Sequence, residues 1–194
     1  MGAAQQRLVD WVFLDRDGTI NQKPPDGDYV TGPAQLALLP GAARAIRCLN
    51  DAGARVAIIT NQRGIALGRM TEADFAKTQA RLERELLLVG AHVDAVYYCP
   101  HAEGTCACRK PGAGMLLKAR RELGDIDFRR AAVIGDSARD IGVGRRVGAL
   151  TFCITAEKSR ASSQAHHVVP SLERAVQYLI PDGPASPAGV AAPR

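Results

Sequence analysis

Aromatic residues are scarce in this sequence, and long apolar runs are absent. Phe, Trp and Tyr together make up 5% of the 194 residues. No run comes near the ~18 consecutive apolar residues of a membrane span, and the first residues, MGAAQQRLVD, lack the apolar core of a signal peptide. Gln6 also stands where a myristoylation signal requires Ser or Thr. We therefore expect a cytoplasmic protein with no membrane partner.

Three common ligand-binding and catalytic motifs are also missing. The sequence has no Walker lysine motif and no G-x-S-x-G nucleophile elbow. Gly142, Gly144 and Gly148 resemble a dinucleotide fingerprint, but their spacing is wrong and they lie in a predicted helix. These absences weigh against P-loop nucleotide binding, serine-hydrolase catalysis and dinucleotide binding.

The composition is that of an ordinary globular protein. Hydrophobic residues make up 46% of the chain and charged residues 23%, which argues against a disordered or fibrous protein. The net charge is +5, but the basic residues are scattered in small groups such as Arg129/Arg130 and Arg145/Arg146. We therefore favour solvated helix faces and sites for small anionic molecules over a nucleic-acid partner.

Short apolar runs alternate with helical patterns along the chain. The runs are typical of buried parallel strands and cover residues 11–14, 56–59, 95–98, 131–134 and 150–154. Helices are predicted over 41–51, after a Thr71/Asp74 capping box, over 115–123 with a start at Pro111, and from Ser171 to 179. This order predicts an α/β fold of three layers, a Rossmann-like parallel sheet with helices on both faces and no large cap domain.

The predicted domain is single and spans residues 1–180. The segment 181–194 is rich in Pro, Gly and Ala, and we expect it to be a disordered tail. A small zinc-binding loop is predicted at 99–108, and a further loop at 21–29. Nothing in the sequence indicates an oligomer, and a monomer is expected.

Cysteine usage indicates a metal rather than disulfides. The chain has five cysteines, an odd number, and no export signal. Four potential ligands follow the spacing C-x-H-x₄-C-x-C and match a closed, tetrahedral structural Zn²⁺ site: Cys99, His101, Cys106 and Cys108. The alternative is a loop of reduced cysteines. Cys48 and Cys153 are interpreted as core residues.

Acidic residues follow two of the predicted strands. Asp15 and Asp17 end the first strand and are expected on one side of it, with Arg16 on the other. Two carboxylates so close need a cation or a shared proton between them, and Mg²⁺ prefers such hard oxygen ligands. Asp136 follows the fourth strand and offers a third carboxylate. The alternative for the first pair is solvated aspartates in a turn.

The ends of other strands offer groups that bind phosphate. Thr60 and Asn61 end the second strand, where a hydroxyl and backbone N–H groups can hold phosphate oxygens. Lys110 supplies a cation. Because ligands bind beyond the carboxyl ends of parallel strands, these residues together predict a site for magnesium and an anion.

The motifs DRDGT, TN, Lys110 and GDSARD, in this order, resemble the haloacid dehalogenase superfamily of phosphohydrolases. The match spans roughly residues 11 to 155. Within the superfamily, GDYV, TNQRGIALG and CPH…CACRKPGAGM look like the D-glycero-D-manno-heptose 1,7-bisphosphate 7-phosphatase group, whose relatives include histidinol phosphatases. The resemblance implies a Mg²⁺-dependent hydrolase that removes a phosphate from a small phosphorylated sugar.

Roles for individual residues follow from the resemblance. It implies that Asp15 is the nucleophile, Asp17 the general acid/base and Asp136 a Mg²⁺ ligand together with both of them. It makes Thr60 and Lys110 phosphate binders. Such a carboxylate can attack phosphorus and form an aspartyl-phosphate, which splits the hydrolysis into two easier steps.

The exact substrate is less well defined by the sequence. Ser137 stands where the heptose group often has Lys, and the loop between the second and third zinc ligands is short. Arg109 and Arg63 are candidates to bind a second phosphate, although Arg109 could also form only a surface salt bridge. The alternatives are a histidinol-phosphate or other small sugar-phosphate phosphatase and, more distantly, a zinc-bearing nucleic-acid module.

Overall fold

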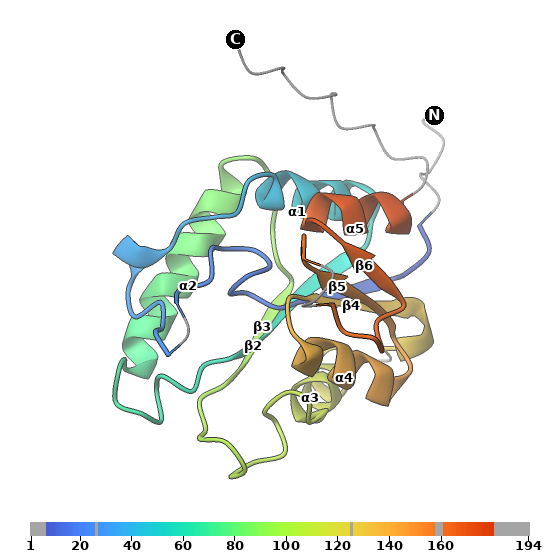
Figure 1. Cartoon of the computed structure of the whole chain (residues 1–194). Helices are drawn as coiled ribbons and strands as arrows, with labels where there is room; N and C mark the ends of the chain where they lie inside the picture. Colours follow the sequence, from blue (N-terminus) through green and yellow to red (C-terminus); the bar gives the residue numbers. More distant parts are fainter. Residues whose placement is uncertain (1–6, 26, 125, 158–160, 181–194) are drawn as a thin grey trace.

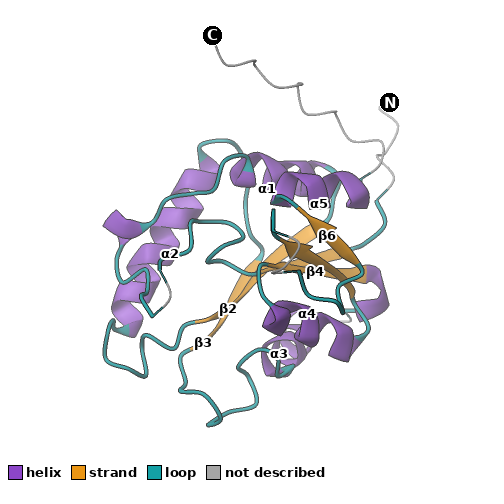
Figure 2. Cartoon of the chain, viewed as in Figure 1, coloured by secondary structure: helices purple, strands orange, loops and turns teal. Residues whose placement is uncertain are grey.

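Parallel strands form a single sheet in the part of the chain that the computed structural model describes, residues 7–25, 27–124, 126–157 and 161–180 (Figures 1 and 2). The strand order is β3-β2-β1-β4-β5-β6. The strands are β1 (Trp11–Leu14), β2 (Arg55–Asn61), β3 (Ala95–Cys99), β4 (Ala131–Gly135), β5 (Leu150–Ile154) and β6 (His167–Val169). The predicted parallel α/β sheet is confirmed.

Helices cover both faces of this sheet (Figure 2). They are α1 (Ala42–Asp51), α2 (Glu72–Leu87), α3 (Gly114–Leu123), α4 (Ala138–Val147) and α5 (Leu172–Leu179), with short 3₁₀ turns at Pro33–Gln35 and Phe128–Arg130. Val12 and Leu14 of β1 pack in the cluster that contains the apolar faces of α1, α2 and α5. Trp11 and Phe13 point into the second cluster, with α3 and α4. The alternation of side chains along β1 thus builds two cores and three layers.

Several helix boundaries agree with the sequence prediction. Helix α2 begins after a capping box in which Thr71 and Asp74 satisfy each other's backbone N–H groups, and Ser171 caps α5. Helix α3 begins at Gly114, later than the predicted start at Pro111. The backbone N–H groups of Gly112 and Gly114 instead donate to the carbonyls of Arg109 and Ala107, at 2.7 and 3.1 Å. These contacts tie the segment to the cysteine-containing loop before the helix can start.

The edge strand β6 has only three residues, which is too short for an alternating pattern to identify, and it was not predicted. The predicted disordered tail, 181–194, lies outside the described residues. A search of the described helices finds none with the length and apolar character required to span a membrane.

Strands are added to one side of β1 first and to its other side afterwards, so the order of the strands switches between β1 and β4. From β1 the chain proceeds to β2 and β3 on one side, and then returns to place β4 on the other side of β1. In parallel sheets such a switch point leaves a crevice beyond the carboxyl ends of the two strands, where ligands bind. Asp15 and Asp136 follow these two strands directly.

Candidate active site

Three carboxylates meet at the switch point. Asp15, Asp136 and Asp140 each have a carboxylate oxygen within 4.8 Å of the others. Asp15 is fixed at the end of β1, where its backbone N–H donates to the Ile134 carbonyl at 2.9 Å. Gly18 has φ 90°, and a Cβ at this position would lie 2.4 Å from Asp136 Oδ2. Only glycine therefore lets the chain turn so close to the cluster.

Lys110 is buried inside this cluster and carries its counter-charge. The residue is 3% exposed. Its Nζ lies 2.9 Å from Asp15 Oδ1 and 2.5 Å from Asp140 Oδ1, and it donates to the Ile59 carbonyl at 2.7 Å. Such a desolvated ammonium group is stable only because two carboxylates and a carbonyl surround it.

The side chain of Asn61 holds the backbone of Lys110. Asn61 Oδ1 accepts from the Lys110 N–H at 3.0 Å, and its Nδ2 donates to the Lys110 carbonyl at 3.2 Å. Asn61 also borders the pocket, and its role in substrate binding stays a prediction. Both polar atoms of its amide group, however, form hydrogen bonds with the backbone of Lys110.

The electrostatic environment changes the proton equilibria of this pair. Burial and the neighbouring charge of Asp140 raise the pKa of Asp15 to about 7, although Lys110 acts in the opposite direction. Burial alone would lower the pKa of Lys110, but the charges of Asp140 and Asp15 raise it above its usual value. Lys110 is therefore a permanent cation at the site.

Asp17 lies in a separate hydrogen-bond network. Its Oδ1 accepts from Arg16 Nε at 3.2 Å, Arg16 Nη2 at 3.0 Å and Asn21 Nδ2 at 2.9 Å. Its Oδ2 accepts from Arg16 Nη2 at 3.1 Å and Gln62 Nε2 at 2.9 Å. Arg16 was expected to face away, yet its fully buried guanidinium turns back to Asp17 and stacks over Phe75 at 5.4 Å.

A pocket of about 240 Å³ opens above these residues. Asp15, Asp17, Thr60, Lys110 and Asp136 border its floor, and the basic side chains around it are Lys23, Arg63, Arg109 and Arg139. The acidic side chains Asp28 and Glu103 also line the pocket. A carboxylate nucleophile candidate thus lies close to several cations, and such cations suit a phosphate ester.

The two arginines predicted to bind a second phosphate differ in their contacts. Arg63 Nε donates to Tyr29 Oη at 3.0 Å, and its guanidinium lies 3.7 Å from the Glu103 carboxylate. Arg109 Nη1 is buried and donates to no acceptor among the described residues. Arg63 therefore links two loops at the rim, while Arg109 retains an unused donor beside the pocket.

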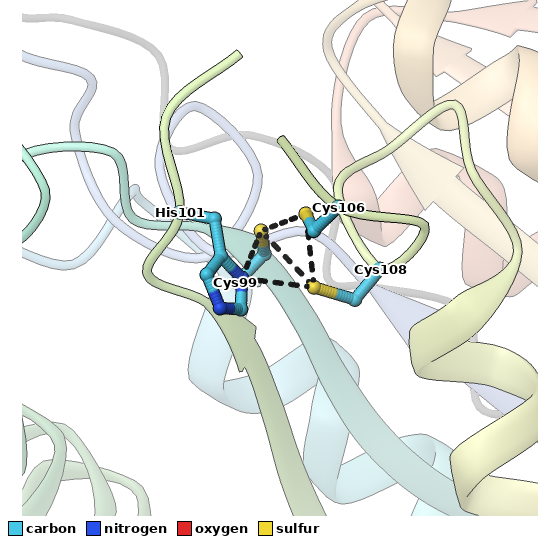
Figure 3. Close-up of side chains that lie close together, drawn as sticks. All are labelled: Cys99, His101, Cys106 and Cys108. Carbon is cyan, nitrogen blue, oxygen red and sulfur yellow. Dashed lines mark hydrogen bonds between the residues drawn. The ribbon is translucent and has the colours of Figure 1, made fainter. Parts of the chain in front are cut away.

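The predicted zinc ligands converge in the loop after β3 (Figure 3). The sulfur atoms of Cys99, Cys106 and Cys108 lie 3.2 to 3.5 Å apart, and His101 Nδ1 lies 3.2 Å from the Cys108 sulfur. A tetrahedral site with Zn–S bonds of ~2.3 Å has edges of roughly 3.8 Å, only slightly longer than these. The donor set, three sulfurs and one imidazole nitrogen, therefore fits Zn²⁺.

Four side chains of the candidate site were given no role from the sequence: Arg16, Asn21, Gln62 and Asp140. The alternation of side chains along a strand predicts the side on which Arg16 leaves the backbone. It does not predict where the guanidinium at the end of this long side chain turns. Asp140 did carry a signal, because it lies one helical turn after Asp136. It caps α4 through Ser137 and also reaches Lys110.

Comparisons with known proteins agree with this geometry. The family model described as haloacid dehalogenase-like hydrolase matches residues 6–148. The chain is 43% identical to the D-glycero-beta-D-manno-heptose-1,7-bisphosphate 7-phosphatase of Rhodopseudomonas palustris, over 70% of this chain and 78% of that protein. It is 36% identical to the corresponding alpha-anomer phosphatase of Mycobacterium bovis, over 78% of this chain and 80% of the relative.

A solved structure is similar over nearly the whole chain. It is the D,D-heptose 1.7-bisphosphate phosphatase from B. bronchiseptica complexed with magnesium and phosphate. The TM-score is 0.81 at 30% sequence identity, and the alignment covers 89% of this chain and 98% of that one.

Proposed function

This chain belongs to the haloacid dehalogenase-like hydrolases, and on that premise we propose that it is a Mg²⁺-dependent phosphomonoesterase with Asp15 as its nucleophile. The main support for this proposal is the position of Asp15. The Asp15 carboxylate stands at the switch point of the sheet, paired with the buried Lys110, at the floor of a pocket rimmed by basic side chains.

The residues around Asp15 fit a divalent cation. Asp140 is already committed, because one of its oxygens pairs with Lys110 and the other accepts from Ser137. The Asp17 carboxylate is surrounded by N–H donors. Asp15 and Asp136 each pair with a lysine, Lys110 and Lys23, through a single oxygen. These two carboxylates would hold Mg²⁺, without the Asp17 carboxylate that was predicted as a further ligand, and the bound ion would neutralise charge on the phosphate oxygens.

Hydrolysis would proceed in two balanced steps. In the first, an Asp15 oxygen attacks phosphorus, the bond from phosphorus to the sugar oxygen breaks, and Asp17 gives a proton to that oxygen. In the second, water attacks the phosphorus of the aspartyl-phosphate and gives a proton to Asp17, and the bond from phosphorus to Asp15 breaks. Both side chains return to their starting state, and inorganic phosphate leaves.

Two groups would hold the transferring phosphate. Lys110 would neutralise charge on its equatorial oxygens, and the Thr60 hydroxyl would donate a hydrogen bond to one of them. Thr60 is buried and borders the same pocket as Asp15. A phosphate held by the Thr60 hydroxyl would therefore lie close to the Asp15 carboxylate.

The substrate we propose is a heptose 1,7-bisphosphate, from which the 7-phosphate is removed. The names of the similar enzymes support this choice. The free donor of Arg109 supports it as well, because a bisphosphate needs a second anion site away from the reacting group. Relatives of both anomeric specificities are similar to this chain, so both anomers belong in the test.

We also propose that one Zn²⁺ occupies the cluster of three cysteines and one histidine. Its role would be structural, since four protein ligands leave no open position. Cys108 is followed directly by Arg109 and Lys110. The metal would therefore fix the segment that brings both cations to the pocket.

The test is phosphate release from a substrate panel with and without Mg²⁺. The panel contains both anomers of the heptose 1,7-bisphosphate, the 7-monophosphate and histidinol phosphate, each measured as kcat/KM. We expect Mg²⁺-dependent release with the highest value for one heptose bisphosphate. A higher value for histidinol phosphate would replace the proposed substrate, and no release from any ester would overturn the reaction class.

A further inference from the structure

The buried side chain of Gln62 joins two parts of the site that the mechanism uses separately. Gln62 is 1% exposed and follows β2 directly. Its Nε2 donates one hydrogen bond to Asp17 Oδ2 at 2.9 Å and another to Thr60 Oγ1 at 2.8 Å. An amide NH₂ has two hydrogens, so both bonds can exist together.

We propose that Gln62 is a positioning residue that aims the Asp17 carboxyl and the Thr60 hydroxyl at the same phosphate ester. This inference rests on the proposed function, because it assumes that Asp17 transfers the proton and that Thr60 binds the phosphate.

The direction of the Thr60 hydroxyl follows from donor and acceptor chemistry. Gln62 Nε2 can only donate, so Thr60 Oγ1 accepts in that bond and keeps its own proton. Among the described residues, Gln62 is the hydrogen-bond partner of this hydroxyl. The remaining proton is thus available to a phosphate oxygen in the pocket that Thr60 borders.

The same bond orients Asp17. Three N–H donors from Arg16 and Asn21 surround Oδ1, which leaves no lone pair there for a proton. Oδ2 has fewer donors, Gln62 and the shared Arg16 Nη2. A proton on Oδ2 needs to replace only the contact with Arg16 Nη2, which Oδ1 shares, and the shorter bond from Gln62 can remain. Oδ2 is therefore the oxygen that carries the transferred proton, and Gln62 fixes the orientation of the carboxyl group.

The backbone of Gln62 is also held in place. Its N–H donates to the carbonyl of the zinc-ligand residue Cys99 at 2.8 Å. The amide side chain thus projects from a segment anchored to the neighbouring strand, which favours one orientation of both hydrogen bonds.

The central variant is Gln62→Met, which has a similar shape but donates no hydrogen bond. The ratio of kcat/KM for the sugar phosphate to that for p-nitrophenyl phosphate is the measurement, because nitrophenolate leaves without a proton. We expect this ratio to fall about 10- to 100-fold, a part of the effect of a general acid. Competitive inhibition by inorganic phosphate should weaken several-fold, because Thr60 loses its orientation.

Two reference variants make the result interpretable. Gln79→Met removes another buried glutamine, which donates to Glu83 on α2 away from the pocket, and the ratio should stay at the wild-type value. Asp17→Asn should lower the ratio at least as far as Gln62→Met. A normal ratio in Gln62→Met, with a low ratio in Asp17→Asn, would overturn the inference and leave the proposed function standing.

A second variant, Gln62→Glu, provides a test if Gln62→Met fails to fold. The new carboxyl group can replace the lost donor only while it shares a proton with Asp17. We expect activity that declines with rising pH over a range where the wild type stays active. A wild-type pH profile would overturn the inference. A wild-type protein without phosphatase activity would overturn both this inference and the proposed function.

Discussion

Lys110 Nζ lies 2.9 Å from Asp15 Oδ1, and the lysine is almost completely buried. The contact joins the candidate nucleophile to the cation that follows the cysteine cluster in sequence. Asp140 also pairs with the ammonium group and completes the arrangement. Lys110 is thus the cation shared by Asp15 and Asp140, whereas Asp17 and Asp136 pair with Arg16 and Lys23.

Replacing Lys110 should therefore destabilise the fold as well as abolish turnover. Lys110→Met leaves Asp15 and Asp140 as buried carboxylates without a counter-charge, and the free energy of unfolding should fall by about 3–5 kcal/mol. Urea denaturation measures this loss. Lys118→Met is the control, because Lys118 is 56% exposed and its pair with Glu122 should contribute less than about 1 kcal/mol. Equal losses in both variants would contradict the role of Lys110.

Arg109 should distinguish a bisphosphate from a monophosphate. Arg109→Ala is expected to raise KM for the heptose 1,7-bisphosphate about tenfold or more, which corresponds to ~1.5–3 kcal/mol for a charged hydrogen bond. KM for the 7-monophosphate should change little. Arg63→Ala is the comparison, and because Arg63 holds Tyr29 and Glu103 it should affect both substrates alike. Equal changes on both substrates in Arg109→Ala would show that Arg109 does not bind the second phosphate.

The cysteine cluster should retain zinc through dialysis. Metal analysis should find about one Zn²⁺ per chain, since four-ligand thiolate sites bind far more tightly than carboxylate sites. Cys108→Ser should lose the metal and lower activity while most of the fold persists. Cys48→Ser, on α1 away from the cluster, should keep both. Fully active protein without zinc would refute the structural role.

Histidine 166 should make the fold sensitive to mild acid. His166 is exposed, but desolvation of its imidazole ring and the nearby charges of Arg145 and His167 lower its pKa below 6.5, and its Nδ1 accepts from the Thr151 N–H at 3.0 Å. The unfolded chain therefore binds the proton more readily. This contribution to stability is complete above pH 6.5 and is lost as pH falls through the lowered pKa.

The measurement is the melting temperature at about pH 7.5 and about pH 5.5. His166→Asn keeps an acceptor near the Nδ1 position and cannot be protonated, so its melting temperature should fall less on acidification than that of the wild type. His92→Asn is the control and should follow the wild type. If His166→Asn also follows the wild type, His166 is not the group responsible.

Much of the fold follows from local patterns in the sequence. Buried strands such as residues 11–14 are continuous apolar runs, and the capping residues Thr71 and Ser171 mark helix starts by short-range hydrogen bonds. The edge strand β6 was missed because three residues contain too little pattern. Its pairing with β5 depends on tertiary contacts instead.

Local sequence patterns likewise predicted some residues of the candidate site and missed others. Asp15 and Asp136 were predicted from residue type and position at strand ends, and the four candidate zinc ligands from the spacing of their residues along the chain. The roles of Gln62 and Arg16 were not predicted, since they depend on where long side chains turn after leaving the backbone. Arg63 and Arg109 looked equivalent in sequence, and only their partners in the folded chain separate them.

The most direct test of Asp15 as the nucleophile is to trap the phosphorylated enzyme. Protein mixed with Mg²⁺ and the heptose 1,7-bisphosphate is quenched in acid within the first turnover, and its peptides are examined by mass spectrometry. We expect a phosphoryl group on the peptide that contains Asp15, and its absence in Asp15→Asn, which should have no turnover. Phosphate release by Asp15→Asn within roughly tenfold of the wild-type rate, or a phosphoryl group on another residue, would contradict this role of Asp15.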